Sequence, residues 1–459
     1  MTCPDVPGFT GELIAPGDGR YHQARTVWNA AIDRCPALIA RAGSTADVVA
    51  VIRYAQDRGM PLSVRGGGHS AAGLAVADGA LMLDLSPMKQ VTVDPAARIA
   101  VAAAGLTWAQ LDAATQKHGL ATTGGVVGST GIAGLTLGGG FGWLDRMAGL
   151  ACDNLVEADV VTADGQVRTV SSTQHPDLFW ALRGGGGNFG VVTSFSYRLH
   201  PVTSAYGGFL GYPFGWAADV LGVYAQASEE APGRLALYAA LVTAPPLPFI
   251  PEGWHGRPLA ALLPVCFGTA DDHPERTVAW LRSRLPAPAV DTTGPMSYCE
   301  VQQLSEGPGV PGMHHYYTAE WLAGLDDAAM QALIGAATRA TSPRSMIVLK
   351  RMGGATAQVP AEATAFWYRQ APHNLDVHAQ WAPGGDASAH RAWAHATRQA
   401  LRAASAGGGY VNFLGDDQGS DRVRAAYGGN YQRLTDVKAR YDPGNFFRIN
   451  HNIPPAACS

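Results

Sequence analysis

The sequence contains VRGGGHS at residues 64–70, GGVVGSTGIAGLTLGGGFG at residues 124–142 and GGGGNFG at residues 184–190. Runs of glycine expose backbone N–H groups with no Cβ in the way, so the chain can approach a pyrophosphate closely. Each stretch follows a segment with the pattern of a β-strand. One such loop is usually a turn, but three in close succession favour a dinucleotide held by several loops.

These loops do not match the two commonest nucleotide-binding motifs. No Gly-Lys-Ser/Thr follows any of them, which excludes a P-loop. None opens a helix as G-x-G-x-x-G with an acidic residue downstream, so a Rossmann site is unsupported. His69 stands inside the first loop, where an imidazole nitrogen, a competent nucleophile, could bind a flavin ring covalently. The alternative is an ordinary hydrogen-bonded histidine.

Composition excludes several classes of protein. Of 459 residues, 47% are hydrophobic and 15% are charged, and the net charge is -4, which argues against a disordered chain and against a nucleic-acid binder. No apolar run reaches the roughly 18 residues of a transmembrane helix. The first residues lack the pattern of a secretory signal, so we expect a cytoplasmic protein. The six cysteines show no C-x-x-C spacing, so we expect no metal site.

The order of the expected elements is that of an α+β protein. We expect a helix before a strand at residues 36–41, then a helix capped by Ser44 or Thr45. Residues 81–120 predict two strands and an amphipathic helix, and residues 154–171 predict a β-hairpin. The second half of the chain reads as antiparallel strands separated by helices.

Four motifs, in this order, carry a resemblance to a known family: VRGGGHS, the long stretch running through GGGFGWLDRMAGLACDNL, DLFWALRGGGGNFGVVTSF, and GGYVNF with YDPGNFFRINHNIPP. They resemble the berberine-bridge-enzyme-like flavoproteins of the vanillyl-alcohol-oxidase superfamily. The resemblance is strong over residues 20–200 and 405–455 and holds only in outline between them. The chain looks nearest to the branch of bacterial secondary metabolism, and is similar to the favorskiase-type flavoenzyme of enterocin biosynthesis.

The resemblance implies a domain organisation. Residues 1–200 would form a p-cresol-methylhydroxylase-type FAD-binding domain in two α+β parts. Residues 201–405 would form a substrate-binding domain, an antiparallel sheet covered by helices. Residues 406–459 would return to the FAD domain. The implied fold class is α+β, as the element order also predicts.

The resemblance also implies FAD attached covalently to His69, because the histidine of RGGGHS carries the flavin in this family. Many members add a second link from a cysteine. Val127 occupies that position here, and Cys152 lies too far along the chain to replace it, so we expect a single covalent bond. The implied cofactor contacts are Arg65, Gly66, Gly67, Gly68, Ser70, Gly125, Val127, Gly131, Gly134, Gly138, Gly139, Gly140, Gly142, Val191, Val192, Asn412 and Asn450.

A general base would help to remove a proton from an alcohol or phenol. Family members use a tyrosine or a glutamate on the sheet of the substrate domain, which makes Tyr238 the first candidate and Tyr410 the second. The alternative for Tyr238 is a half-buried strand residue. Thr130 lies in the segment that faces the flavin in relatives, and its hydroxyl could affect the reaction with oxygen.

Three further groups of polar residues leave two interpretations open. Lys350 and Arg351 could lower the pKa of a neighbouring tyrosine or bind an anionic substrate, or could form a solvated strand end. His378 and Gln380 share one face of a strand that ends at Trp381, and that face could line a pocket or point outward. The run His314–Tyr317 lacks a carboxylate that would complete a metal site.

The implied activity is that of an oxidoreductase. The first hypothesis is an oxidase that takes hydride from an alcohol, an amine or a related carbon of a secondary metabolite onto FAD and is reoxidised by O2 to give hydrogen peroxide. An oxygenating flavoenzyme of polyketide-type biosynthesis and a non-catalytic flavin-binding protein are the alternatives. The expected partners are O2 and a small-molecule substrate, aromatic or extended and apolar. We expect no nucleic-acid or membrane partner, and a homodimer is consistent with the sequence.

Overall fold

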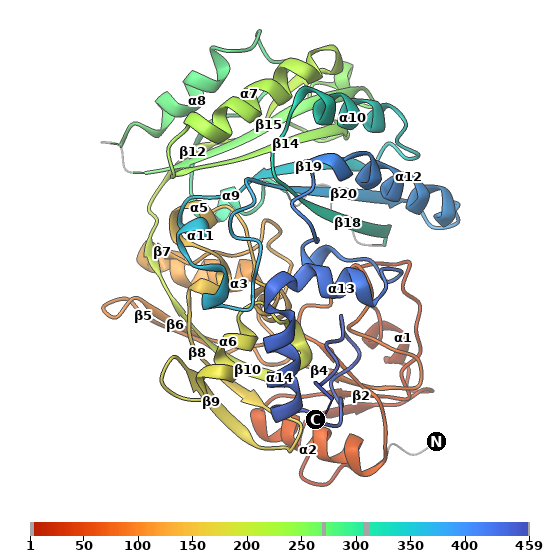
Figure 1. Cartoon of the computed structure of the whole chain (residues 1–459). Coiled ribbons are helices and arrows are strands. Elements are labelled where there is room, and N and C mark those ends of the chain that lie inside the picture. The colour runs from red at the N-terminus through yellow and green to blue at the C-terminus, as the bar shows by residue number, and fades with distance from the viewer. Residues whose placement is uncertain (1–3, 269–271, 306–311, 458–459) are drawn as a thin grey trace.

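The computed structural model of the chain describes residues 4–268, 272–305 and 312–457. Figure 1 shows two halves, one above the other. The lower half holds a four-stranded and a five-stranded sheet, built from β1 to β6 and β8 to β10, and the upper half holds one large sheet built from strands β12 to β20. The combination of helices with mainly antiparallel sheets confirms the predicted α+β class.

The N-terminal sheet positions the first glycine loop. Its strands follow the order β1 (Glu12–Ile14), β2 (Leu38–Arg41), β4 (Leu81–Asp84) and β3 (Leu62–Arg65), and the last three are parallel. Helix α2 (Thr45–Asp57) packs between this sheet and the next. Its predicted cap is confirmed, because the Ser44 hydroxyl accepts a hydrogen bond from the Asp47 N–H. β3 runs directly into the loop at Gly66.

The helix expected just before residue 36 is wrong. Helix α1 (Tyr21–Ala24) ends earlier, and the chain then runs in turns and extended segments up to β2. Asn29 explains the difference, because its side-chain oxygen accepts hydrogen bonds from the N–H groups of Ala31 (3.1 Å) and His315 (2.9 Å). A side chain that binds the backbone in this way competes with helix formation, and here it ties the loop to the upper half.

The second lower sheet is antiparallel throughout. Its order is β5 (Val91–Asp94), β6 (Ile99–Ala103), β10 (Val191–Arg198), β8 (Leu155–Val161) and β9 (Val167–Ser171). The predicted hairpin at residues 154–171 is confirmed as β8 and β9. Residues 81–120 hold three strands rather than two, because the Asp94 carboxylate accepts from the N–H groups of Ala96 and Ala97 and makes a turn between β5 and β6.

Short elements connect these two sheets and complete the lower half. They are α3 (Trp108–Thr115), β7 (Leu120–Ala121) paired with β11 (His200–Pro201), α4 (Ile132–Leu137), α5 (Asp145–Ala148) and α6 (Pro176–Leu182).

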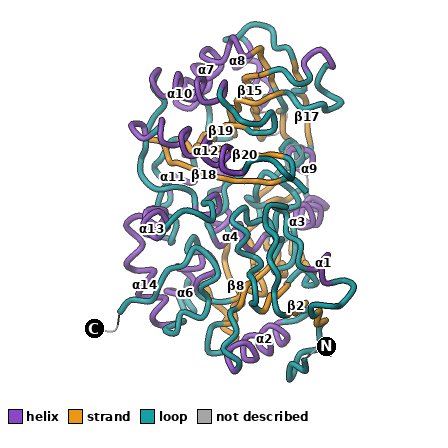
Figure 2. The backbone as a smooth tube through the Cα atoms, turned by 90° about the vertical axis from the view of Figure 1, so that its right-hand side faces the viewer, coloured by secondary structure: helices purple, strands orange, loops and turns teal. Residues whose placement is uncertain are grey.

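The upper half is one antiparallel sheet of nine strands. Its main path is β16 (Val290–Asp291), β13 (Leu210–Pro213), β15 (Pro258–Phe267), β14 (Leu235–Thr243), β19 (Met346–Arg351), β20 (His373–Trp381) and β18 (His314–Leu322). Off this path, β12 (Ala205–Gly207) pairs with β15, and β17 (Gly294–Met296) pairs with β12. Four helices, α7 (Ala217–Glu230), α8 (Pro274–Arg282), α10 (Asp327–Thr338) and α12 (Ala387–Ala400), cover the face away from the lower half. The other face therefore points toward the glycine loops (Figures 1 and 2).

The chain then returns to the lower half. Helix α13 (Ser420–Tyr427) leads to α14 (Tyr431–Tyr441), which packs against α6 (Figure 2). Two short helices, α9 (Tyr298–Val301) and α11 (Ala355–Gln358), lie in the connections between the halves. No helix among the described residues is long and apolar enough to cross a membrane.

Candidate active site

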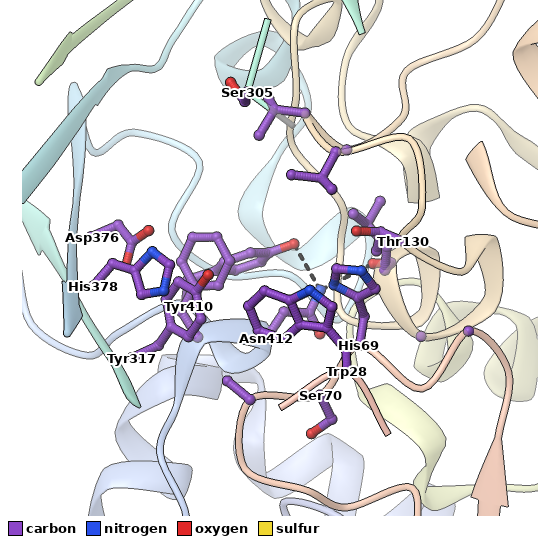
Figure 3. Close-up of a pocket in the computed structure, with 18 of the residues that line it drawn as sticks. Trp28, His69, Ser70, Thr130, Ser305, Tyr317, Asp376, His378, Tyr410 and Asn412 are labelled. Atoms are coloured by element: carbon purple, nitrogen blue, oxygen red, sulfur yellow. Dashed lines mark hydrogen bonds between the residues drawn. The ribbon is translucent and has the colours of Figure 1, made fainter. Parts of the chain in front are cut away.

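A cavity of about 730 Å³ lies between the glycine loops and the open face of the upper sheet. Strand alternation explains the sheet side of it. Leu237, Ala239 and Leu241 of β14 pack under the covering helices, whereas Tyr238 and Ala240 line the cavity. Figure 3 shows side chains from both walls, with Asp376 and His378 on one side and His69 on the other.

The first two glycine loops pack backbone against backbone. A Cβ on Gly67 would lie 2.3 Å from the nitrogen of Gly131, and a Cβ on Gly131 would lie 2.4 Å from the nitrogen of Gly67. Only glycine permits this approach, since the opposing atoms belong to main chain that cannot move aside. Gly68 has a φ of 69°, which is also a glycine conformation. The cavity floor is therefore a fixed surface of backbone.

His69 sits on this floor with its imidazole held from two sides. Its Nε2 lies 3.0 Å from the Ser129 hydroxyl, and its ring stacks on Trp28 at a centroid distance of 4.6 Å. Burial lowers the pKa of His69 to about 4, because the charged form loses its hydration. The ring is therefore neutral at physiological pH and keeps a nitrogen lone pair, as a nucleophile requires.

The structure brings together most of the residues predicted to contact the cofactor. Those that line the cavity are Gly66, Gly67, Gly68, His69, Ser70, Gly125, Val127, Gly131, Gly134, Val191, Val192, Asn412 and Asn450. The three candidate catalytic residues, Thr130, Tyr238 and Tyr410, line the same cavity.

Five of the predicted cofactor contacts do not line the cavity. The Arg65 guanidinium instead pairs with Asp84 at 2.6 Å and holds β3 to β4. The four glycines Gly138, Gly139, Gly140 and Gly142 serve close packing. A Cβ on Gly142 would lie 1.9 Å from the carbonyl oxygen of Gly124, and the Gly140 N–H donates to the Tyr410 hydroxyl. These glycines shape the site from behind.

The third glycine loop is tied to the C-terminal tail by a buried lysine. The Lys438 ammonium donates to the carbonyl oxygens of Asn188 (2.7 Å) and Phe447 (2.9 Å) and pairs with Asp442 at 2.6 Å. The Asn188 amide donates to the carbonyl of His451 (3.2 Å). Phe447 and His451 line the cavity, so this network holds the tail against the third loop.

Tyr238 and Lys350 form one polar corner of the sheet wall. The Lys350 ammonium pairs with Asp145 at 2.8 Å, donates to the carbonyl oxygen of Gly142 at 3.1 Å, and lies 4.8 Å from the centre of the Tyr238 ring. Burial lowers the pKa of Lys350 and raises that of Asp145. The Tyr238 hydroxyl has no hydrogen-bond partner among the described residues, and burial raises its pKa well above 10.

The two open interpretations on β19 and β20 are now resolved by position. Arg351 points away from the cavity and donates to carbonyl groups that follow α7, including that of Ala231 at 2.7 Å, so it is neither a solvated strand end nor a cavity residue. His378 and Gln380 line the cavity, whereas Trp381 lies on the other face against His390. His378 accepts or donates a hydrogen bond of 2.9 Å with His315.

Sequence reasoning missed Asp376, which shares the cavity face of β20 with His378 and Asn374. Its nearest cross-strand partners are Val348 and Ala319, so its carboxyl stands among apolar groups. Burial raises the pKa of Asp376 to about 8. The alternation of side chains along a strand could have identified it. Residues two apart share a face, so a strand that directs His378 into a pocket also directs Asp376 there.

The donor set of this cavity fits a flavin dinucleotide. Backbone of three glycine loops, apolar walls from Leu135, Val191 and Val192, and one neutral histidine surround the space. Among the residues that the structure describes, histidine, cysteine and carboxylate side chains form no group of three that could hold a metal ion. The glycine backbone, the apolar walls and the neutral histidine suit an organic cofactor.

Comparisons with known proteins agree with this interpretation. The family described as "FAD binding domain" matches residues 36–171, and "Berberine and berberine like" matches residues 409–454. The FAD-linked oxidoreductase YgaK of Bacillus subtilis is 30% identical over 452 residues, covering 97% of both chains. The (R)-6-hydroxynicotine oxidase of Paenarthrobacter nicotinovorans is 32% identical over 466 residues, also covering 97% of both.

Solved structures of the same fold cover nearly the whole chain. The 6-hydroxy-D-nicotine oxidase of Arthrobacter nicotinovorans superimposes with a TM-score of 0.86 at 29% identity, covering 97% of this chain and 98% of that one. The berberine bridge enzyme of Eschscholzia californica gives a TM-score of 0.86 at 21% identity, covering 99% and 98%.

This chain belongs to the berberine-bridge-enzyme-like family of FAD-linked oxidoreductases. The predicted family, the enzyme class and FAD as the cofactor are thereby confirmed. The closer similarity to the favorskiase-type flavoenzyme stays a prediction.

Proposed function

We propose that this protein is an oxidase that removes hydride from a carbon bearing a hydroxyl or amine group of a small molecule. FAD would accept the two electrons and pass them to O2, giving hydrogen peroxide. The observation that carries the proposal is the Asp376 carboxyl, which faces the His69 side of the same cavity (Figure 3). A mostly apolar cavity that holds both a base and a flavin site suits hydride removal.

A single covalent bond at His69 is part of the proposal. Ser129 and Trp28 hold the neutral imidazole in one orientation, which favours attack on the cofactor. Val127 lines the cavity and carries no thiol. Cys152 is buried behind Gly139, to which its N–H donates at 2.9 Å, and it does not line the cavity. These positions support one link rather than two.

Asp376 is a better candidate for the general base than either tyrosine. Burial raises the pKa values of both tyrosine hydroxyls above 10 but that of Asp376 only to about 8, so of the three groups Asp376 loses its proton most readily near neutral pH. The Tyr410 oxygen accepts hydrogen bonds from the Gly140 N–H (3.1 Å) and the Asn412 amide (2.8 Å), so its own proton is left to donate to a ligand. We assign Tyr238 and Tyr410 to substrate binding and Asp376 to proton removal. Thr130 keeps its proposed role near the reaction with oxygen.

The experiment begins with the purified yellow protein. We expect the flavin of the wild type to stay with the protein after acid precipitation. In a His69→Ala variant we expect the precipitate to contain no flavin. Under anaerobic conditions, a substrate of the enzyme should bleach the flavin absorbance. In air, the same substrate should give one molecule of hydrogen peroxide for each O2 consumed. Covalent flavin in His69→Ala would overturn the attachment site. Label from ¹⁸O2 in the product would replace the oxidase by an oxygenating enzyme.

A further inference from the structure

The polar groups of the cavity wall differ in how their charge is balanced. The Lys350 ammonium is already used by Asp145 and by the Gly142 carbonyl. The His378 imidazole is used by His315. The buried Oδ1 of Asp376, in contrast, has no hydrogen-bond partner among the described residues. The wall therefore carries one acidic group without a counter-ion.

The surroundings of Asp376 make this imbalance costly. Its cross-strand partners Val348 and Ala319 offer no hydrogen bond from their side chains, and burial is the one cause that raises its pKa. Burying an ionised carboxyl without a partner destabilises the folded protein. The cost is removed when a cation pairs with the carboxylate or when the carboxyl takes up a proton. Five other titratable groups line the same cavity, namely Tyr238, Tyr317, Lys350, His378 and Tyr410, together with Arg344, which is exposed and precedes Ser345 at the Gln380 end of β20. The Lys350 ammonium is already paired with Asp145, and burial lowers the pKa of His378 well below 6.5, so neither supplies a free cation to Asp376.

Two amide groups flank the carboxyl along β20. The Nδ2 of Asn374 and the Nε2 of Gln380 are buried and lack hydrogen-bond partners in the described part of the chain. At about 3.4 Å per residue they stand about 7 Å before and about 14 Å after Asp376. Neutral polar groups of a ligand suit these amides, whereas only a cation removes the cost at Asp376.

We propose that the substrate is an amine that enters as an ammonium ion and is anchored by Asp376, with an apolar or aromatic body in the rest of the cavity. The proposal rests on the oxidase function proposed above. The cavity lining supports the apolar body, because it includes Phe209, Leu247, Phe249, Ile250 and Leu304.

The anchoring group also accounts for the proton. An N–H bond of the ammonium breaks, an O–H bond forms on the Asp376 carboxylate, and the nitrogen lone pair is freed. The α-carbon would then lose hydrogen as hydride and a C=N bond would form, with bound FAD supplying the acceptor that carries the two electrons on to O2. The proton on Asp376 and the hydride complete one hydrogen peroxide. The net change is amine plus O2 to imine plus hydrogen peroxide, with no further reactant.

The test compares ligands that differ only in charge. Three amine–alcohol pairs are titrated into the flavin-loaded protein by calorimetry at pH 7: benzyl, 2-phenylethyl and 2-naphthylmethyl. Repeating the titrations in buffers of different ionisation enthalpy measures the protons released. At pH 7 the Asp376 carboxyl is mainly protonated in the free protein, because its pKa is about 8. An ammonium ion that pairs with it therefore releases close to one proton, and an alcohol releases none.

We expect at least one amine to bind ten or more times tighter than its alcohol in the wild type. The preference and the proton release should disappear in Asp376→Asn and persist in Asp57→Asn, the same substitution at an exposed position at the end of α2. Equal binding within all three pairs, or a preference that survives Asp376→Asn, would overturn the proposal. Should Asp376→Asn fail to fold, proton release in the wild type alone decides. If amines bind with this preference but no substrate reduces the flavin, the proposed oxidase function is wrong and the amine site remains.

Discussion

The glycine loops and the sheet wall face one another across one cavity but are built in opposite ways. The loops present backbone, and Gly67 and Gly131 lie so close that neither tolerates a Cβ. The sheet presents side chains such as Asp376 on alternate positions of strands whose framework does not depend on them. The loop wall should therefore fail when one methyl group is added, and the sheet wall should lose chemistry while it keeps its fold.

The largest expected effect breaks the loop wall. In Gly67→Ala the new Cβ would meet the backbone of Gly131 at 2.3 Å, and rigid main chain cannot relax as a side chain can. We expect a loss of about 3 kcal/mol or more in the free energy of unfolding and almost no covalent flavin. Urea unfolding and the absorbance of acid-precipitated protein measure the two effects.

Gly187→Ala is the matched control for that change. Gly187 also lies in a cavity-lining glycine loop, but a Cβ there would meet nothing within 4 Å. Its φ of -80° suits alanine. We expect unfolding within about 0.5 kcal/mol of the wild type. Equal damage from both substitutions would mean that close backbone packing is not what distinguishes the first loop.

The next effect tests the sheet wall. Asp376→Asn keeps the size of the side chain and removes the base, so we expect the rate of flavin reduction to fall by about 10²- to 10⁴-fold. Tyr238→Phe removes only a hydroxyl that donates to ligand, and should cost about tenfold at most. Stopped-flow reduction without air measures both. A larger loss in Tyr238→Phe than in Asp376→Asn would return the base to the tyrosine.

This contrast also explains how much the sequence could predict. Runs of glycine with one histidine are contiguous, so the local pattern VRGGGHS is enough to locate the loop wall and His69. Even there, Gly142 was predicted to touch the cofactor, although it packs against Gly124. A contiguous glycine motif indicates that the backbone closely approaches another group. It does not indicate whether that group is the cofactor or another part of the chain.

The sheet wall could be predicted only in part, because its residues come from strands far apart in sequence. Tyr238 and Lys350 are more than a hundred positions apart and meet through the register of β14 with β19. His378 was recognised by its alternation with Gln380, yet Asp376 in the same period was overlooked. The free-energy cost of burying the Asp376 carboxyl arises because Val348 and Ala319 lie opposite it on the neighbouring strands. The sequence around Asp376 does not show these neighbours.

A smaller effect sharpens the same contrast through pH. The pKa of Asp376 is raised from about 3.8 in the unfolded chain to about 8 in the folded protein. As pH rises above 4, the carboxyl loses its proton in the unfolded chain but keeps it in the folded protein. The free energy of unfolding therefore falls until pH reaches about 8. Asp376→Asn removes this loss. We expect its stability relative to wild type to rise by on the order of 1 kcal/mol per pH unit between pH 5 and 8, as measured by urea unfolding. A difference that is flat over this range would place the titration elsewhere.

The smallest expected effect concerns the rim of the cavity, which belongs to neither wall. Phe249 lines the cavity with 49% of its surface exposed, close to Phe209 at a ring distance of 6.3 Å. Phe249→Ser removes part of the apolar contact with the body of a substrate and leaves the base and the flavin site untouched. We expect KM to rise about two- to fivefold with kcat unchanged. Val167→Ser, at a 51% exposed position on β9 outside the cavity lining, should leave both constants unchanged. A fall in kcat at Phe249 would show that the rim takes part in positioning the reacting carbon.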